Sequence, residues 1–227
     1  MRHTKDLSKL SIDGALCISL KNRQDRREIL KKEFRESRLL IEFIIVEPDL
    51  ENPERGCFDS HIKCARLAIK RGYRNVLILE DDATLLAFSP RKISRMNDFI
   101  EERSPQLLYL GATLGKLWLT WTIGIARIRA KGSFAYILSA DGCKQLLSYA
   151  PYTGTQIDKV FSKNFKAYGA FPFICQHQPE GIAKSNISVC RPSNGTLADE
   201  RFWRRNWRRQ FTQAVRNIGK TVIRRDI

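Results

Sequence analysis

The chain has 227 residues, enough for one α/β domain with a full core or for two small domains. Its 43% hydrophobic and 28% charged residues are ordinary for a globular protein. The charge balance is not, because 40 Lys and Arg face 24 Asp and Glu, a net charge of +16. An anionic partner is therefore expected: a nucleotide, a nucleic acid or an acidic membrane surface.

The six cysteines are scattered, and none forms a Cys-x-x-Cys pair, which argues against a zinc ribbon. Several lie in apolar runs, so buried, reduced thiols are expected. No apolar segment is long enough for a signal peptide or a membrane span. We therefore predict a reducing cytosolic setting and interpret the two glycosylation-type triplets, at Asn186 and Asn194, as chance matches.

Strands and helices are expected to alternate through the first half of the chain. Short apolar runs predict buried strands at 15–20, 41–46, 76–79 and 107–110. Helical spacing and breaker residues predict helices at about 24–38, 60–71 and 90–103. A loop rich in proline and acidic residues is expected to run to Gly56. This alternation is typical of βαβ units, so we predict an α/β fold with a mostly parallel central sheet flanked by helices.

The apolar pattern dissolves between Gly111 and Gly132, where Trp118 and Trp121 lie in a basic segment punctuated by glycines. An irregular segment is expected there. After it, further elements are predicted: a strand at 134–138, a helix capped at 139–141 and reaching 149, a helix from about 156, and a strand at 170–175.

Residues 201–227 form a basic tail that we separate from a catalytic domain at 1–200. The tail holds nine Arg and Lys against one acid. Its apolar residues follow a helical spacing: Trp203, Trp207, Phe211, Val215, Ile218 and Val222. We predict an amphipathic helix that lies on an anionic membrane. One alternative is that the apolar stripe packs on the catalytic domain while the arginines stay solvated; a nucleic-acid tail is the least favoured.

The strongest indication of a functional site is a run of four apolar residues, 76–79, followed directly by Glu80, Asp81 and Asp82. Carboxylates at the end of a buried parallel strand lie in the crevice where open α/β sheets bind ligands. Three adjacent acids repel one another unless a cation or hydrogen-bond donors compensate. Oxygen ligands favour Mg²⁺ or Mn²⁺, which often bridges to a phosphate. The alternative is an acidic turn solvated by water.

Five short motifs occur in order along the chain. They are Ile18-Ser19-Leu20-Lys21-Asn22-Arg23 with Asp25-Arg26-Arg27, Gly56-Cys57-Phe58-Asp59-Ser60-His61, Ile78-Leu79-Glu80-Asp81-Asp82, Ala135-Tyr136-Ile137-Leu138-Ser139, and Ile157-Asp158. Together they resemble glycosyltransferase family 25, the lipooligosaccharide and collagen-type sugar transferases. The resemblance implies a GT-A-type nucleotide-sugar-binding fold over about residues 15–187.

Transfer from a nucleotide sugar needs a cation on the diphosphate, because the leaving group departs with negative charge. Asp82 is the leading candidate ligand, followed by Glu80, and the expected ion is Mn²⁺ or Mg²⁺. His177 follows a late apolar strand, and the resemblance implies that such a histidine can supply a further ligand. The alternative for His177 is an ordinary surface or core residue.

The nucleotide is expected in the loop after the first strand, next to the acidic turn. The candidate nucleotide-sugar-binding residues are Ser19, Leu20, Asn22, Arg26, His61, Asp81, Lys184 and Ser185. His61 is expected at a helix start, where backbone amides favour anions. The alternatives are that Arg26 is a solvated helix residue and that Ser60 merely caps the helix.

The characterised galactosyl transfers of family 25 invert the anomeric centre, and an inverting reaction needs one carboxylate base for the acceptor hydroxyl. Asp158 is the candidate base; the alternative is a helix N-cap. Trp118, Trp121 and Tyr152 are candidates to stack on the acceptor sugar. The tryptophans could equally pin their loop to the core.

The sequence therefore predicts a metal-dependent hexosyltransferase that moves galactose or glucose from a UDP-sugar to a glycan or glycolipid such as lipopolysaccharide. The expected location is the cytoplasm, peripherally on the inner face of a membrane. Two alternatives remain at this point: a Mg²⁺-dependent nuclease or phosphotransferase, and a non-catalytic binding protein with a glycosyltransferase fold.

Overall fold

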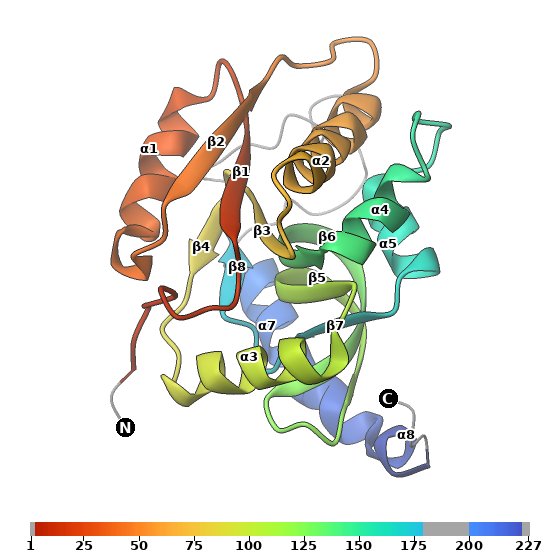
Figure 1. Ribbon diagram of the computed structural model, residues 1–227. Coiled ribbons are helices and arrows are strands. Elements are labelled where there is room, and N and C mark those ends of the chain that lie inside the picture. The colour runs from red at the N-terminus through yellow and green to blue at the C-terminus, as the bar shows by residue number, and fades with distance from the viewer. Residues whose placement is uncertain (1–2, 179–199, 224–227) are drawn as a thin grey trace.

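The computed structural model describes residues 3–178 and 200–223 (Figure 1). Its strands are β1 (Gly14–Leu20), β2 (Ile41–Val46), β3 (Asn75–Glu80), β4 (Ala83–Leu85), β5 (Leu107–Leu119), β6 (Ile125–Ser139), β7 (Ala167–Ala170) and β8 (Cys175–His177). Its helices are α1 (Gln24–Glu33), α2 (Pro53–Lys70), α3 (Arg91–Arg103), α4 (Ala140–Leu147), α5 (Ile157–Asn164), α7 (Glu200–Arg216) and α8 (Ile218–Ile223), with a 3-10 turn at Arg35–Ser37.

The core of the fold is a six-stranded sheet in the order β2-β1-β3-β6-β5-β7. β2, β1 and β3 pair in parallel, β6 runs antiparallel to both β3 and β5, and β7 is parallel to β5. All strands of this sheet except β6 therefore point the same way. The predicted α/β class, with a mostly parallel central sheet flanked by helices, is confirmed.

The sheet is covered on both faces, which explains why β3 reads as a continuous apolar run. Val76 and Ile78 belong to a buried cluster with side chains of α2, α4 and α5. Leu77 and Leu79 point the other way, into a cluster with side chains of α1 and α3. The five cysteines that the structure describes form no disulfide, and four of them are buried. β3 is thus held from both sides, and its carboxyl end is a rigid place for a site.

Helix α2 begins earlier than predicted. The side chain of Asn52 accepts a hydrogen bond from the amide of Arg55 at 3.1 Å, and Pro53 occupies the first turn. Asn as cap followed by Pro is a strong helix start. The expected loop to Gly56 is therefore wrong in its last part, and the motif that ends at His61 lies within the helix, where no free backbone amides face a ligand.

The segment expected to be irregular is instead a long antiparallel ribbon made by β5 and β6. Its pairing is interrupted by register shifts between Tyr109 and Lys116, which bend the ribbon. Gly111 and Gly115 look like breakers in the sequence, but a Cβ at these positions would collide with the carbonyls of Cys175 and Arg129. The glycines permit close backbone approach within a sheet.

The strand predicted at 170–175 is also different, because it is divided between two sheets. β7 ends at Ala170 and belongs to the central sheet, whereas β8 begins at Cys175 and pairs antiparallel with β4. The short strand β4, which directly follows the acidic turn, was not predicted. It is only three residues long, so it carries little periodicity of its own.

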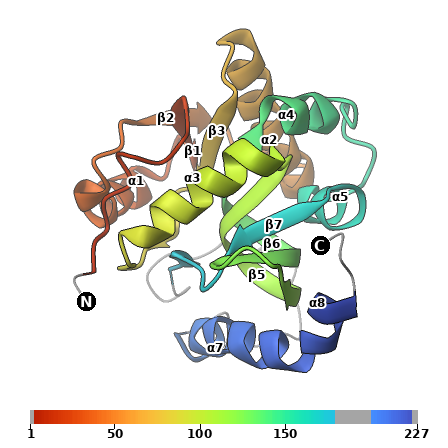
Figure 2. The same cartoon turned by 60° about the horizontal axis from the view of Figure 1, so that its bottom comes forward.

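The basic tail is helical over 200–223, as predicted, with a break at Asn217 between α7 and α8. The helices lie along β5 and β6 (Figure 2). Polar side chains attach them to the β5 backbone: Asn206 accepts from Leu114 N at 2.8 Å and donates to Ala112 O at 3.0 Å. Asn217 and Thr221 donate to carbonyls further along β5. The tail is thus packed against the body of the protein.

This packing can be tested at Asn206. Asn206→Leu would leave the buried amide of Leu114 and carbonyl of Ala112 without their side-chain partner, so we expect a loss of about 2–4 kcal/mol in the free energy of unfolding. Urea denaturation measures it. The exposed Thr212→Ala in the same helix is the control and should change stability by less than about 0.5 kcal/mol. Equal stability of the two variants would contradict the docking of α7.

Candidate active site

A cleft of about 450 Å³ opens at the carboxyl ends of the parallel strands β1, β2 and β3, the usual ligand position in such sheets. The first half of α2 forms its opposite wall. Residues lining it include Ser19, Leu20, Arg23, Arg26, Val46, Asp49, Gly56, Cys57, His61, Glu80, Asp81 and Asp82. The first three sequence motifs, far apart in the chain, therefore meet around one cavity.

Two buried carboxylates lie at the end of β3. Asp81 and Asp82 are 5% and 4% exposed, and Arg26 of α1 donates from the same Nη1 atom to Asp81 Oδ1 and Asp82 Oδ2, both at 3.0 Å. Burial, together with the charge of Asp82, raises the pKa of Asp81. The guanidinium supplies the cation that the sequence argument requires, and Arg26 is 7% exposed, so it is not a solvated helix residue.

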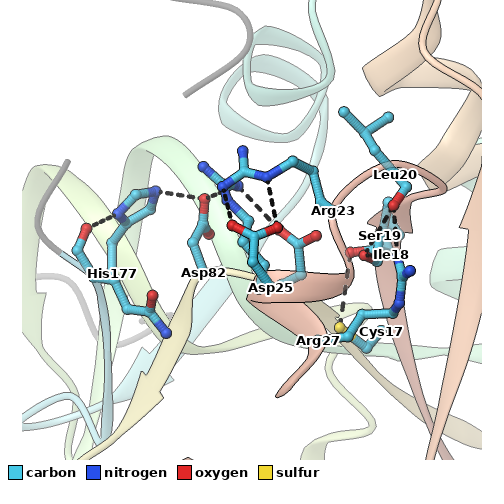
Figure 3. Close-up of polar contacts among 12 residues, drawn as sticks. Cys17, Ile18, Ser19, Leu20, Arg23, Asp25, Arg27, Asp82 and His177 are labelled. Carbon is cyan, nitrogen blue, oxygen red and sulfur yellow. Dashed lines mark hydrogen bonds and ion pairs between the residues drawn. The ribbon is translucent and has the colours of Figure 1, made fainter. Parts of the chain in front are cut away.

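His177 contacts the carboxylate of Asp82, which Arg26 also contacts. β8 pairs with β4 so that His177 lies opposite Ala83, which places its Nε2 3.0 Å from Asp82 Oδ2 (Figure 3). Its Nδ1 contacts the Gln178 carbonyl at 2.5 Å. Burial alone would lower the pKa of His177, but Asp82 raises it to about 9. His177 and Arg26 overcome the effect of burial on Asp82, so that its pKa is lowered.

These residues can be compared with the requirements of a divalent cation. Asp82 Oδ1 is buried without a hydrogen-bond partner, so one hard oxygen ligand is free beside His177. Glu80 lies elsewhere, with Oε1 3.5 Å from His61 Nε2. Within the described ranges, no group of three His, Cys, Asp or Glu is arranged to hold an ion. Asp82 Oδ1 is therefore open to an ion that takes its other ligands from a diphosphate or water, whereas His177 would join it only on releasing its proton and its contact with Asp82 Oδ2.

A second polar network lies on the α2 side of β3. His61, 1% exposed, contacts the hydroxyl of Tyr136 through Nδ1 at 2.6 Å and faces Glu80 through Nε2. Ser60 does not cap a helix start, because its hydroxyl donates to Gly56 O within α2 at 2.6 Å. His61 therefore lies inside α2, so the predicted helix start with free amides is wrong, while its imidazole faces Glu80 and lines the cleft.

Asp158 joins this network from α5. Gln156 is the N-cap of α5, so the N-cap alternative for Asp158 is wrong. Burial, followed by the charge of nearby Glu80, raises the pKa of Asp158 to about 6, although hydrogen bonds with Ser133 act in the opposite sense. A carboxylate with such a pKa is suited to accept a proton near neutral pH.

Most predicted nucleotide-binding residues line the cleft. Ser19, Leu20, Arg26, His61 and Asp81 do so. Asn22 is exposed and does not line it. The predicted residues Lys184 and Ser185 lie outside the described part of the chain.

The predicted acceptor residues are not brought together. Trp118 pairs with Arg127 near the far end of the β5–β6 ribbon, and Trp121 is 64% exposed in the turn that follows. Neither lines the cleft. Tyr152 lies closer, because its hydroxyl donates to Glu54, beside Pro53 of the cleft wall, at 3.3 Å.

Two supporting residues were missed from the sequence. Arg27 donates to Ser19 Oγ and to the carbonyls of Leu20 and Lys21, which holds the β1–α1 loop against the cleft (Figure 3). Its place in the Asp25-Arg26-Arg27 motif was the available signal. Trp203 of α7 stacks on His177, with ring centroids 4.7 Å apart and planes at 11°. Nothing in the sequence links the tail to a histidine 26 positions earlier.

A family model described as glycosyltransferase family 25 (LPS biosynthesis protein) matches residues 44–129. The match includes the motif at 56–61 and the acidic turn at 80–82. The resemblance to family 25 predicted from the motifs is thereby confirmed, and the functional class that it supports is a glycosyltransferase.

Solved structures of similar architecture include A197 from STIV, with a TM-score of 0.41 at 8% identity over 71% of this chain and 82% of that one. A glycosyltransferase involved in glycosylation of the major capsid of PBCV-1 has a TM-score of 0.37 at 14% identity, over 66% and 76%. UDP-glucose pyrophosphorylase complexed with UDP-glucose has a TM-score of 0.42 at 12% identity, over 69% and 73%.

The role of Arg26 predicts a large effect on stability. Arg26→Met would leave two buried carboxylates without their shared cation, so we expect a loss of about 3–5 kcal/mol in the free energy of unfolding. Asp81→Asn in the same chain should restore part of it, because less negative charge then remains. Urea denaturation at neutral pH measures both, with the exposed Lys32→Met as control. If Arg26→Met behaved like Lys32→Met, the carboxylates would not depend on this guanidinium.

Proposed function

We propose that the protein transfers a hexose, galactose or glucose, from a UDP-sugar to a hydroxyl of a glycan or glycolipid, with inversion at the anomeric carbon. The observation that carries the proposal is the cleft at the carboxyl ends of β1–β3. The acidic turn forms part of its lining and lies inside the segment that matches family 25. The cleft volume of about 450 Å³ lies in the range of small-molecule sites.

We propose that the donor binds against the residues that line this cleft. Uridine fits beside Ser19 and Leu20 in the loop that Arg27 holds, and the diphosphate then lies toward the acidic turn. Arg23 and Arg26, which line the cleft, provide positive charge on that path. Asp82 and His177 are the proposed ligands of Mn²⁺ or Mg²⁺. When bound, the ion would supply electrostatic stabilisation of the departing diphosphate.

We propose that proton transfer uses residues on the other side of Glu80. We assign Asp158 as the base that accepts the proton of the acceptor hydroxyl. Its support is its raised pKa, caused by desolvation and by the nearby charge of Glu80, and its place on α5, which packs on the α2 side of the sheet. Tyr152 is the remaining candidate for contact with the acceptor sugar, since it lies beside the cleft wall.

The charge distribution argues against the nuclease alternative. In the described ranges the cations of the ribbon and tail are exposed on β5, β6 and α7, whereas the acidic turn is bordered by Arg23 and Arg26. A polynucleotide would need a continuous track of cations that leads to the catalytic acids, whereas among the described residues Arg23 and Arg26 are the two Lys or Arg side chains that line the cleft.

The donor site is tested at Asp82. Asp82→Asn removes one charged oxygen ligand, so metal-dependent hydrolysis of UDP-galactose or UDP-glucose should fall by at least about a hundredfold. The exposed Asp98→Asn should leave the rate unchanged. Product UDP is quantified in the presence of Mn²⁺, and circular dichroism checks the fold. Hydrolysis at the wild-type rate in folded Asp82→Asn protein would sink the assignment.

The assignment of Asp158 as the base is tested by the pH dependence of the transfer rate. The pKa of Asp158 is raised to about 6, so its base form is present above that pH, and transfer should fall as the pH decreases through about 6. Asp158→Asn should abolish transfer yet retain donor binding, because the base acts on the acceptor. Initial rates between pH 5 and about 8, with calorimetry of UDP binding, measure both. Donor binding lost together with transfer would move Asp158 into the nucleotide site.

A further inference from the structure

Only the first part of the tail's apolar stripe packs on the body of the protein, where Trp203 is 6% exposed. The buried side of α7 is formed by Trp203, Asn206, Gln210 and Ala214. Along the stripe, Phe211, Val215 and Ile218 are 39%, 74% and 59% exposed. The hydrogen bonds of Asn206, Asn217 and Thr221 to the β5 backbone, here called the polar ladder, hold the helices in place. Phe211, Val215 and Ile218 of the stripe face outward.

A second exposed apolar group lies next to it, at the turn between β5 and β6. Trp121 and Ile123 in this turn are 64% and 70% exposed. Thr221 of α8 donates to Leu119 O at 2.8 Å, just before the turn. On the other side, the amide of Phe171 donates to Gly124 O at 2.7 Å. The Phe171 ring lies 5.6 Å from that of Phe211. The turn and the tail helices are thus neighbours, as Figures 1 and 2 also show.

The same two regions concentrate positive charge. Residues 107–139 and 201–223 contain eleven Lys and Arg and no Asp or Glu. All seven tail cations are exposed, as are Lys116, Arg129 and Lys131 on the ribbon. Arg204 and Arg208 precede Phe211 by seven and three residues, spacings that place them on the same side of the helix as the stripe. Exposed aromatic and aliphatic side chains are therefore bordered by arginines.

We propose that the β5–β6 turn and the outer face of α7–α8 together form one docking surface for an anionic lipid bilayer. The acyl region would receive Trp121, Ile123, Phe211, Val215 and Ile218, and the acidic headgroups would pair with the surrounding cations. Nucleic acid would satisfy the cations but leave the aliphatic side chains in water. A second copy would bring like charges together. The inference does not depend on the proposed sugar transfer.

The surface would hold the protein on a bilayer without crossing it. In the described ranges, no helix combines the length and apolar character that a membrane span requires. Docking therefore depends on both parts of the surface, the turn and the helices. A tail that binds alone would leave Trp121 and Ile123 without a role.

Co-sedimentation with vesicles tests the proposal on the full-length protein. Wild-type protein should sediment with phosphatidylglycerol–phosphatidylcholine vesicles, stay in solution with phosphatidylcholine alone, and dissociate as NaCl rises above about 0.1 M. The double variant Trp121→Ser/Ile123→Ser should lower the partition coefficient about tenfold or more, because two apolar side chains are lost. Leu40→Ser, at a leucine 95% exposed on another part of the surface, is the matched control and should bind like wild type.

A second measurement covers the case in which the double variant misfolds. The fluorescence of wild-type protein minus that of Trp121→Phe reports on Trp121, and lipids with brominated acyl chains should quench it. Equal binding of the double variant and wild type, equal binding to neutral vesicles, or absence of quenching would each overturn the proposal. Binding to a DNA duplex without binding to vesicles, or dimerisation that buries the turn, would overturn it as well.

Discussion

The site depends on the neutralisation of two buried carboxylates at the end of β3. Asp81 and Asp82 leave the sheet side by side, and each would be costly to bury as an isolated charge. One guanidinium atom of Arg26 contacts both, and His177 contacts Asp82 from the opposite side. The first helix, the acidic turn and β8 are therefore tied to one another by charge as well as by packing.

Two separate polar environments lie at the end of β3, one on each face of the sheet. On the side of α1 and β8, the charges are suited to bind phosphate or a divalent ion. On the side of α2 and α5, Glu80, His61 and Asp158 form a network in which the pKa of Asp158 is raised. Alternation along β3 puts Glu80 on the same face as Val76 and Ile78, whereas Asp81 and Asp82 follow the end of the strand and both contact Arg26. The sheet geometry thus turns three adjacent acids into two distinct environments.

The tail contributes to the site as well as to the surface. Trp203 stacks on His177, and Phe134 of β6 meets the same imidazole edge to face at 5.7 Å. The orientation of His177 therefore depends on α7, which the polar ladder fixes to β5. The tail was separated from the catalytic domain by its basic composition. This criterion misses the contact with His177, because the basic residues lie on the exposed side of the helix and Trp203 lies on the buried side.

Sequence patterns predicted the parallel part of the sheet well, because β1 and β3 are largely buried and their apolar runs are continuous, and because the edge strand β2 is still rich in β-branched residues. The β5–β6 ribbon was missed because its glycines permit close contacts that involve residues distant in sequence, such as Cys175. The acidic turn and most of the residues predicted to bind the nucleotide line one cleft. The ion pairs of Arg26 and His177 with Asp82 join positions 56 and 95 residues apart, and no local pattern carries that information.

The most direct measurement is a crystal structure of the protein grown with UDP and Mn²⁺, with data collected at the manganese absorption edge. The account predicts an anomalous peak within coordination distance of Asp82 and His177, with the diphosphate bound to the ion and the uracil beside Ser19 and Leu20. UDP bound away from the ends of β1–β3, or manganese bound without Asp82, would contradict it.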